Sequence, residues 1–543
     1  MIQRSLLFIL AVSLSACSVF NKGNNQPPQN TYTFSQEITE EGLYQDLAVL
    51  AHDSLQGRET GTIGEEKAAR FLAKRYKEMG LKAVGDDNSY FQYYDLVQQS
   101  VDEIRYELRT SDSDSVVDMS IHNSSEGGNF VTLFGGSDPI SGEVVFAGAG
   151  VVNEEEGINQ FPEDVSGKWL LVMYDQDHTN MRYLQSVLGP EQAIGAIIVV
   201  GTDTEDFEQE VESRKGSFGQ GGGLSLKYRQ TDSGGVSSAF NRAHPELAAK
   251  MLGLDSLKSL AEMQESLITE PNAFEARELN FVLSHDPDVK EEIVRTQNVV
   301  AFLEGTDPQL KNEVVVLTSH YDHVGIGRPD STGDRIYNGA DDDGSGTVAA
   351  LSAAGAMMKA KEAGFGTKRS VLFMNVSGEE KGLLGSRYYS DHPIFSIENT
   401  VANINMDMIG RVDEEHIADS NYVYIIGGEI ISSQMDSLTQ MANLMGPNLT
   451  LSDRYNDLED PNQFYRRSDH WNFGRLGVPF VFLFNGTHED YHRPQDHIEK
   501  ITFGPLKKRT QLVYNLTALL ANSPDRPVVD NQAFIEKTQV QAR

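Results

Sequence analysis

The sequence predicts an α/β protein with a three-layer α/β/α core, a mostly parallel sheet and an inserted β-rich domain. Two observations predict this fold class. From residue 291 onward, apolar runs alternate with loops and helical segments, and continuous apolar strands suit a sheet that is buried on both faces. Between residues 106 and 290, short β-like runs alternate with polar and glycine-rich stretches. The length of 543 residues also exceeds what a single core supports.

The individual elements follow from the hydropathy pattern. Apolar runs predict core strands at 314–317, 371–374, 401–406 and 478–484. An alanine-rich segment at 347–359 fits the crossover helix that parallel strands need. Residues 36–100 carry helical patterning, and apolar residues at helical spacing predict a helix over 64–79 that Gly80 ends. In the insert we expect strands at 143–147, 169–173 and 196–200, and an exposed loop at 219–223.

The first residues are typical of a secretion leader. Arg4 is followed by an apolar run at 6–14, which is shorter than the roughly 20 residues that cross a bilayer. Leu14-Ser15-Ala16-Cys17 resembles the lipobox of bacterial lipoproteins, which implies cleavage before Cys17 and its lipidation. An ordinary cleaved signal peptide is the alternative. We therefore expect an envelope protein, anchored in the outer membrane if the source is Gram-negative and facing the periplasm or the surface.

Six segments are predicted: a lipoprotein signal peptide at 1–16, a lipidated and flexible tether at 17–36, core parts at 37–105 and 291–525, the insert at 106–290, and a C-terminal tail at 526–543. Cys17 is the only cysteine, so no disulfide is expected. The formal charge of −35 argues against nucleic-acid binding, which requires a basic surface. No second segment is apolar enough to span a membrane, so membrane contact is expected only through the lipid anchor.

Acids and histidines follow the predicted core strands and occupy the glycine-rich loop between them. They are His320, Asp342, Glu380, Asp407 and His492. Because ligands of open α/β sheets bind outside the carboxyl ends of strands, we expect these side chains to meet. Two imidazoles and three carboxylates form a ligand set for two divalent metals, and imidazole suits zinc, although cobalt or manganese fits the same set.

The chemistry of such a centre requires further residues. Two metals lower the pKa of a bridging water toward ~7, and one more carboxylate must then take its proton. The pair Glu379-Glu380 offers one acid for metal and one for that proton. Asp322 lies two residues after His320 and is expected to hold the imidazole nitrogen that does not bind metal.

The run His488-Glu489-Asp490-Tyr491-His492 also satisfies the H-E-x-x-H pattern of single-zinc proteases. That pattern binds zinc only when both histidines lie on one face of a helix. Gly486 precedes the run and Pro494 follows it, so a helix is not expected here.

The motifs together resemble the zinc aminopeptidase family that includes bacterial leucyl aminopeptidases, aminopeptidase Y and glutamate carboxypeptidase. The matching stretches are Ser54–Gly61, His320–Asp322, Asn338–Gly346, Ser377–Gly382, Asn405–Arg411, Ser468–His470 and Tyr491–Asp496. The resemblance covers residues 40–100 and 290–520 and implies a phosphorylase/hydrolase-like peptidase core.

The resemblance also implies roles for these residues. Asp342 bridges two zinc ions. The ligands that complete the two sites are His320 with Asp407, and Glu380 with His492. Glu379 acts as general base and then as acid, and Tyr465 hydrogen-bonds the oxyanion of the tetrahedral intermediate.

In the insert, the stretches Asp164–Val172 and Ala193–Ile198 resemble a protease-associated domain, and residues 201–240 are longer than that module needs. The expected function is an aminopeptidase acting on peptides. Alternatives are a carboxypeptidase, for which Arg466, Arg467 and Arg493 would bind the substrate carboxylate, a single-zinc glutaminyl cyclase, and a non-catalytic receptor-like binding protein. The sequence does not indicate the oligomeric state.

Overall fold

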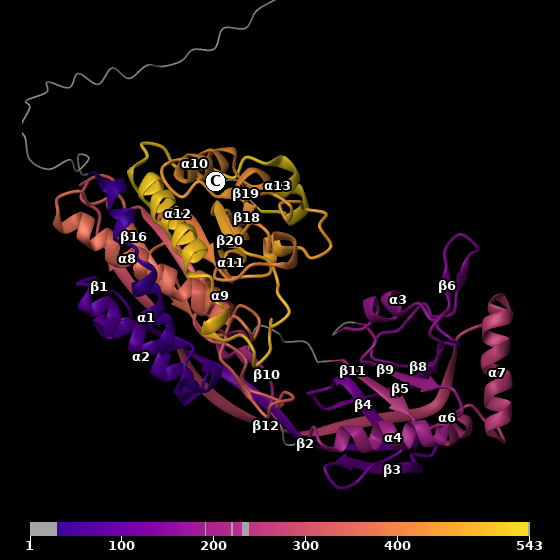
Figure 1. The fold of residues 1–543 in the computed structure, drawn as a ribbon. Helices are drawn as coiled ribbons and strands as arrows, with labels where there is room; N and C mark the ends of the chain where they lie inside the picture. Colours follow the sequence, from indigo (N-terminus) through magenta and orange to yellow (C-terminus); the bar gives the residue numbers. More distant parts are fainter. Residues whose placement is uncertain (1–29, 190–191, 219–220, 231–237, 541–543) are drawn as a thin grey trace, which may run out of the picture.

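A computed structural model of the chain describes residues 30–540, apart from 190–191, 219–220 and 231–237. It has two lobes joined by two long strands (Figure 1). The core lobe contains residues 30–99 and 291–540, and the insert lobe contains residues 100–290. The predicted leader with Cys17 and the first part of the tether lie outside the described residues. Among the described helices, none has the length and apolar character needed to cross a membrane.

The core sheet carries the predicted parallel strands at its centre. Its order is β19 (Thr450–Ser452), β18 (Tyr422–Gly427), β20 (Phe480–Phe484), β17 (Thr400–Met406), β13 (Val314–His320), β16 (Ser370–Val376), β12 (Arg277–Leu303) and β1 (Lys82–Ala83). The pairs from β20 to β16 are parallel. The pairs β18–β20 and β16–β12 are antiparallel. The mostly parallel sheet is confirmed, with antiparallel pairs toward its margins.

Alternate residues of the central strand β13 face two different cores. Val315 and Leu317 pack in a core with α1 (Glu40–Leu50), α2 (Ile63–Glu78), α8 (Gly346–Glu362) and α12 (Phe503–Asn522). Val314 and Val316 pack on the other face with α9 (Leu384–Asp391) and α11 (Trp471–Gly474). Because side chains alternate along a strand, this pattern buries both faces of the sheet and makes three layers.

Helix α2 shows why the sequence forms helices where it does. Thr62 caps its first turn by accepting a hydrogen bond from the Glu65 N–H, and acidic side chains follow in that turn. Basic side chains lie in its last turn, and Gly80 follows with a positive φ of 80°. The helix predicted at 64–79 is thus confirmed to within one residue.

Two long strands connect the lobes. β2 (Phe91–Thr110) and β12 pair antiparallel along almost the whole length of β2. The borders predicted at 105 and 290 therefore fall inside continuous strands. The helical patterning expected up to residue 100 is wrong for residues 91–100, which alternate between buried and partly exposed positions as a strand does.

The insert lobe is built on the far ends of these strands. Its sheet continues from β12 through β5 (Ile140–Phe146), β8 (Trp169–Tyr174), β9 (Gly195–Val200), β11 (Ala239–Ala243) and β4 (Phe130–Gly135), while β3 (Val116–Asn123) pairs with β2. α4 (Thr204–Lys215), α6 (Pro245–Met251) and α7 (Leu257–Thr269) lie around it (Figure 1). Trp169 is fully buried and donates to the Leu283 carbonyl at 3.0 Å.

Three local expectations differ from the structure. Of the loop predicted at 219–223, residues 219–220 lie outside the described residues, and the rest belongs to strand β10 (Gly221–Leu226), which pairs with β2. The end of the predicted tether, residues 31–36, belongs to the 3-10 helix Thr31–Glu37, which buries Phe34 against the core. The predicted C-terminal tail includes α13 (Gln532–Thr538), which buries Phe534.

Candidate metal centre

The carboxyl ends of the core strands bring five predicted ligands together. His320 is the last residue of β13, and Asp407 follows the last residue of β17. Glu380 lies on the loop after β16, and His492 lies beyond β20. Asp342 comes from the glycine-rich loop Ala340–Ser345 that leads into α8. Local sequence places each side chain at a strand end or loop, and the parallel order of the strands makes them neighbours.

Asp342 lies between two groups of ligands. Its Oδ1 is 3.1 Å from His320 Nε2, and its Oδ2 is 3.1 Å from His492 Nε2. On the first side, His320 Nε2 is also 3.6 Å from Asp407 Oδ1. On the second side, His492 Nε2 is 3.0 Å from Glu380 Oε2. The structure therefore has two groups, each of one imidazole and one carboxylate, with Asp342 shared between them.

The charges of the centre are strongly coupled. Burial acts to raise the pKa of Asp342, yet hydrogen bonds from His320 and His492 hold it well below its usual range. Burial and the neighbouring carboxylate of Asp342 act to raise the pKa of Glu380, but hydrogen bonds from the imidazoles of His323 and His492 lower it to about 2. Burial acts to lower the pKa of His492, whereas Asp342 and Glu380 raise it to about 10. Ionised carboxylates thus concentrate negative charge where cations would bind.

Asp343 connects the glycine-rich loop to the neighbouring strands. Its Oδ2 accepts a hydrogen bond from the His320 N–H at 3.2 Å, and its Oδ1 accepts from the Met408 N–H at 3.1 Å. Met408 is the residue after Asp407. The peptide bond between Asp342 and Asp343 is cis. Asp343 therefore fixes the backbone beside two predicted ligands, although it is not a ligand itself.

A second layer of acids holds the loop from behind. Asp496 Oδ2 accepts hydrogen bonds from the N–H groups of Asp341 and Asp342, at 2.9 and 3.1 Å. Asp341 Oδ2 lies 3.3 Å from His488 Nε2. Asp341 thus contacts His488, Asp343 contacts backbone N–H groups, and only Asp342 faces both groups of ligands.

Arg58 is a buried residue whose importance the sequence did not reveal. Its guanidinium donates to the carbonyl oxygens of Tyr321, Leu50, Asn338 and Gly339 at 2.6–2.9 Å. These carbonyls flank His320 on one side and the glycine-rich loop on the other. One side chain from the N-terminal segment thus ties together the two loops that carry His320 and Asp342. In the sequence, the importance of Arg58 is indicated only by its position in Ser54–Gly61, one of the stretches that carry the family resemblance.

Asp322 is placed differently from the expectation. The partner of His320 Nδ1 is the backbone carbonyl oxygen of Asp322 at 3.1 Å, while the Asp322 carboxylate is 3.7 Å from that nitrogen. The carboxylate accepts instead from the Glu379 N–H at 3.2 Å and from Thr60 Oγ1 at 2.9 Å. Residue 322 still orients His320, but it does so through its backbone.

Glu379 lies on the side of His320. One oxygen of Glu379, one nitrogen of His320 and one oxygen of Asp407 lie within 4.8 Å of one another. Burial raises the pKa of Glu379 well above its usual range, and the carboxylates of Asp407 and Glu380 raise it further against the charge of His320. A carboxyl group with a raised pKa can hold and release a proton near neutral pH.

His323 belongs to the centre and was not predicted. It is fully buried, and its Nδ1 lies 2.8 Å from Glu380 Oε1 and 3.8 Å from Asp342 Oδ2. With Asp342 and Glu380 it forms a second cluster of groups within 4.8 Å. The available signal was a second imidazole only one residue beyond Asp322, at the same strand end.

Tyr465 is not among the residues that line the small cavity over these ligands. It is buried, and its ring contacts the ring of Trp471. The cavity is lined by Phe464, Arg467, Ser468 and Tyr491 among others. Tyr491 stacks on the ring of His492 with 4.0 Å between centroids. The role of Tyr465 at the oxyanion stays a prediction.

The H-E-x-x-H run does not form a helix. His488 lies in an irregular segment and residues 489–492 are turns, and the two histidines have different partners. His488 faces Asp341, whereas His492 faces Asp342 and Glu380. The prediction against a helical zinc site is confirmed.

The donor set fits divalent metal ions. The Nε2 atom of His323 is buried without a hydrogen-bond partner among the described residues. Buried polar atoms normally have partners, and imidazole with carboxylate oxygen is the ligand chemistry of zinc sites. Ser468 Oγ donates to Asp407 Oδ2 at 2.7 Å, which is the second-layer support that metal-binding carboxylates usually have.

Imidazoles and carboxylates that converge at the ends of the parallel strands of an α/β/α sandwich form a candidate site for divalent metal ions. Residues 298–517 match the model of peptidase family M28.

Curated aminopeptidases are similar to part of the chain. The probable leucine aminopeptidase 2 of Aspergillus oryzae is 33% identical over 207 residues, which are 37% of this chain and 35% of that protein. Aminopeptidase YwaD of Bacillus subtilis is 28% identical over 208 residues, 37% of this chain and 40% of that protein. Such matches span less than two thirds of the relatives' own lengths.

A solved structure aligns over most of the chain. The aminopeptidase from Aneurinibacillus sp. strain AM-1 is 17% identical, covering 92% of this chain and 98% of that one with a TM-score of 0.47.

Proposed function

We propose that the protein is a di-zinc metallo-exopeptidase, an aminopeptidase that removes the N-terminal residue of peptides. The observation that supports this most strongly is the position of Asp342. Its two carboxylate oxygens each lie 3.1 Å from a different imidazole, those of His320 and His492. A carboxylate placed in this way is suited to bridge two cations. The match to peptidase family M28 and the names of the curated relatives also support the proposal.

Each residue then has a defined task. His320 and Asp407 would hold one cation, Glu380 and His492 would hold the other, and the carboxylate of Asp342 would be shared between them. Bound zinc would supply a water of lowered pKa and polarise the peptide carbonyl. Glu379 takes the proton of the attacking water and passes it to the leaving amine. Asp322 positions Glu379 through the hydrogen bond to its N–H.

A carboxypeptidase is the second candidate, because Arg467 lines the cavity over the ligands and could pair with a substrate carboxylate. The same cavity is lined by Phe464, Phe482 and Phe484, which suit an apolar side chain at the cleaved residue. The names of the relatives favour the aminopeptidase.

A panel of aminoacyl and carboxyl-terminal reporter substrates, assayed with and without a chelator, tests the proposal. We expect hydrolysis of aminoacyl reporters that the chelator abolishes and added zinc restores. Hydrolysis of carboxyl-terminal reporters alone would favour the carboxypeptidase. Hydrolysis that resists the chelator would contradict both.

We also propose that Cys17 carries the lipid anchor in the cell envelope and that the insert lobe is a protease-associated domain. The sequence patterns described above support both. Mass spectrometry of the mature N-terminus tests the anchor, since a cleaved and acylated Cys17 is expected and an unmodified cysteine would contradict it.

A further inference from the structure

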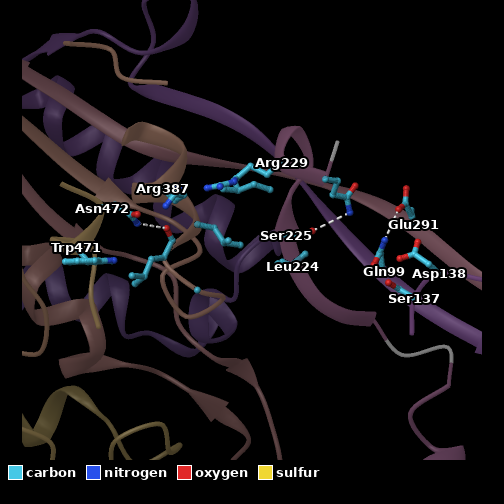
Figure 2. A pocket seen from close by; sticks show the side chains of 15 residues that line it. Gln99, Ser137, Asp138, Leu224, Ser225, Arg229, Glu291, Arg387, Trp471 and Asn472 are labelled. Carbon is cyan, nitrogen blue, oxygen red and sulfur yellow. Dashed lines mark hydrogen bonds between the residues drawn. The ribbon is translucent and has the colours of Figure 1, made fainter. Parts of the chain in front are cut away.

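A cavity of about 820 Å³ lies between the two lobes (Figure 2). From the core lobe, its wall is formed by residues 382–384, Arg387 and the pair Trp471 and Asn472. From the other side, its wall is formed by residues of β2, β10, β12 and the short helix α5 (Lys227–Gln230). Cavities of roughly 300–1,000 Å³ are the size class that binds small ligands. None of the predicted metal ligands lines this cavity.

The cavity adjoins the metal centre through two shared segments. In the first, Glu379 and Glu380 line the cavity over the ligands, while Gly382 to Leu384 line the interlobe cavity. In the second, Phe464, Arg467 and Ser468 line the cavity over the ligands, while Trp471 and Asn472 line the interlobe cavity. Asn472 Nδ2 donates to the Leu383 carbonyl at 3.1 Å and joins the two segments. The two cavities are thus lined by neighbouring residues of the same two segments.

Three arginines surround a single carboxylate at the side of this cavity. Asp391 lies 3.1 Å from Arg387 Nε, 3.0 Å from Arg475 NH2 and 3.5 Å from Arg229 NH1. Three guanidinium charges against one carboxylate leave a local excess of positive charge. Arg229 and Arg387 line the cavity. The whole chain has a formal charge of −35, so this positive excess is opposite in sign to the net charge of the molecule.

The positive charge is confined to one end of the cavity. Figure 2 shows Arg229 and Arg387 near one another, between Asn472 and Ser225. The acidic side chains Glu291 and Asp138 lie at the opposite end, beside Gln99. Glu291 Oε1 accepts a hydrogen bond from Gln99 Nε2 at 2.9 Å. An anionic group would therefore be bound at the end that is next to the core lobe.

The insert sequence supplies one side of this positive end. Strand β10 pairs with β2, and the following helix α5 carries Tyr228 and Arg229 to the core lobe. Tyr228 Oη donates to Asp391 Oδ2 at 2.7 Å, and the Tyr228 ring lies 4.6 Å from the His392 ring. Residues of β10 and α5, which lie within the segment 201–240, thus contribute a wall of the cavity.

We infer that the interlobe cavity binds the part of a peptide substrate that follows the cleaved bond, and that Arg229 and Arg387 bind a carboxylate of that part. Guanidinium groups bind carboxylates through charge-assisted, often paired hydrogen bonds. The substrate class is then short peptides in which a free C-terminal carboxylate or an acidic side chain reaches Arg229 and Arg387. The inference rests on the proposed peptidase function.

Four substrates with the same N-terminal residue separate the two sources of the carboxylate. They are a tripeptide with a free C-terminus, the same tripeptide amidated, an amidated tripeptide ending in glutamate, and an aminoacyl p-nitroanilide. We expect kcat/KM to be about tenfold higher for the free tripeptide than for its amide, the effect of one charge-assisted contact. A similar gain for the amidated glutamate peptide would identify side-chain carboxylates as ligands too.

The double variant Arg229→Gln/Arg387→Gln should abolish this preference and leave the p-nitroanilide rate unchanged. The matched control is Arg70→Gln, because Arg70, like Arg387, pairs with an acid one helical turn away, Glu66, but lies on the exposed face of α2. The control should behave as the unsubstituted protein. Equal loss on all four substrates would indicate a structural effect and would overturn the inference, as would a preference that survives in the double variant.

A binding measurement keeps this test separate from the proposed activity. Trp471 lines the cavity, whereas Trp169, the other tryptophan, is buried in the insert lobe. Titration of the free tripeptide into the Glu379→Gln chain should change Trp471 fluorescence, with an affinity about tenfold weaker in the added double variant. If the chain without substitutions hydrolyses no peptide but this difference in affinity is observed, the proposed function alone would be refuted. Equal affinities would refute the inference alone.

Discussion

The Asp322 carboxylate accepts a hydrogen bond from the backbone N–H of Glu379, with a distance of 3.2 Å between nitrogen and Oδ1. Asp322 follows strand β13, and Glu379 follows strand β16. The other oxygen of Asp322 accepts from Thr60 Oγ1 at 2.9 Å. One buried carboxylate thereby joins the loop of His320 to the loop of the proposed general base. The position of Glu379 over the metal centre depends on this link.

Asp322→Ala removes the acceptor for the Glu379 N–H, so we expect kcat to fall about 10- to 100-fold, as for other supporting residues of metal sites. Asp322→Asn keeps an oxygen acceptor and should lose less. Zinc content, measured by elemental mass spectrometry beside kcat, should stay at two ions per chain in both variants. Loss of zinc with unchanged activity per bound metal would show that Asp322 supports the metal ligands rather than Glu379.

Glu379→Gln tests the proton carrier. The amide cannot accept the proton of the attacking water, so kcat should fall by about 10²–10⁴. The ligands His320, Asp342 and Asp407 are untouched, and the metal content should therefore be unchanged. A Gln variant with nearly full kcat would exclude Glu379 as the base.

His323→Ala removes the imidazole whose Nδ1 lies 2.8 Å from Glu380 Oε1. Glu380 then loses a partner on the side away from His492, and the affinity for the second zinc ion should weaken about 10- to 100-fold. Competition with a zinc chelator measures this affinity directly.

His488→Ala is the matched control for this experiment. His488 is also a buried histidine beside a carboxylate, but its partner is Asp341, which faces neither group of ligands. The control should keep both ions. If His488→Ala loses zinc and His323→Ala does not, the assignment of the two histidines is reversed.

Glu65 predicts a pH dependence of stability. It is fully buried on α2, accepts from Thr296 Oγ1 at 2.7 Å, and contacts the Ser377 hydroxyl. Burial raises its pKa to about 7. Because an unfolded glutamate titrates near 4.5, the folded state binds more protons between these values. The stability that this group supports is complete below about pH 4.5 and is lost as the pH rises to about 7, by about 3 kcal/mol at most.

Denaturant unfolding at fixed zinc concentration, from pH 4.5 to 8, measures this effect against Glu65→Gln. The free energy of unfolding of the unsubstituted protein should fall relative to that of the variant over this interval. Parallel curves for the two proteins would contradict the assignment.

The sequence predicts the features that depend on local pattern. Apolar strands such as 314–317 are recognisable because both faces of the sheet are buried, and His320 and Asp407 are recognisable because each directly ends or follows such a strand. The helix over 64–79 has a threonine cap and a glycine stop. These signals all lie within a few residues of the feature they predict.

Features that depend on distant partners are not readable in this way. Strand β2 and residues 277–298 of β12 are rich in polar side chains and partly exposed, and the longest continuous apolar run is formed by the last residues of β12, 299–303. Arg58 acts on carbonyl groups about 260–280 residues away. The carboxylate of Asp322 bonds to Glu379 rather than to His320 because the loop after β16 folds over it. Only the assembled fold shows which neighbour each of these groups has.

The number of zinc ions per chain, measured with and without the Asp342 carboxylate, tests the central claim most directly, because two cations sharing Asp342 require a count of two that depends on this residue. Elemental analysis of the purified protein should find two ions per chain, and Asp342→Ala should lose both zinc and peptide hydrolysis. One ion per chain would point to the glutaminyl cyclase alternative. An Asp342→Ala chain that keeps two ions and hydrolyses peptides normally would contradict the account.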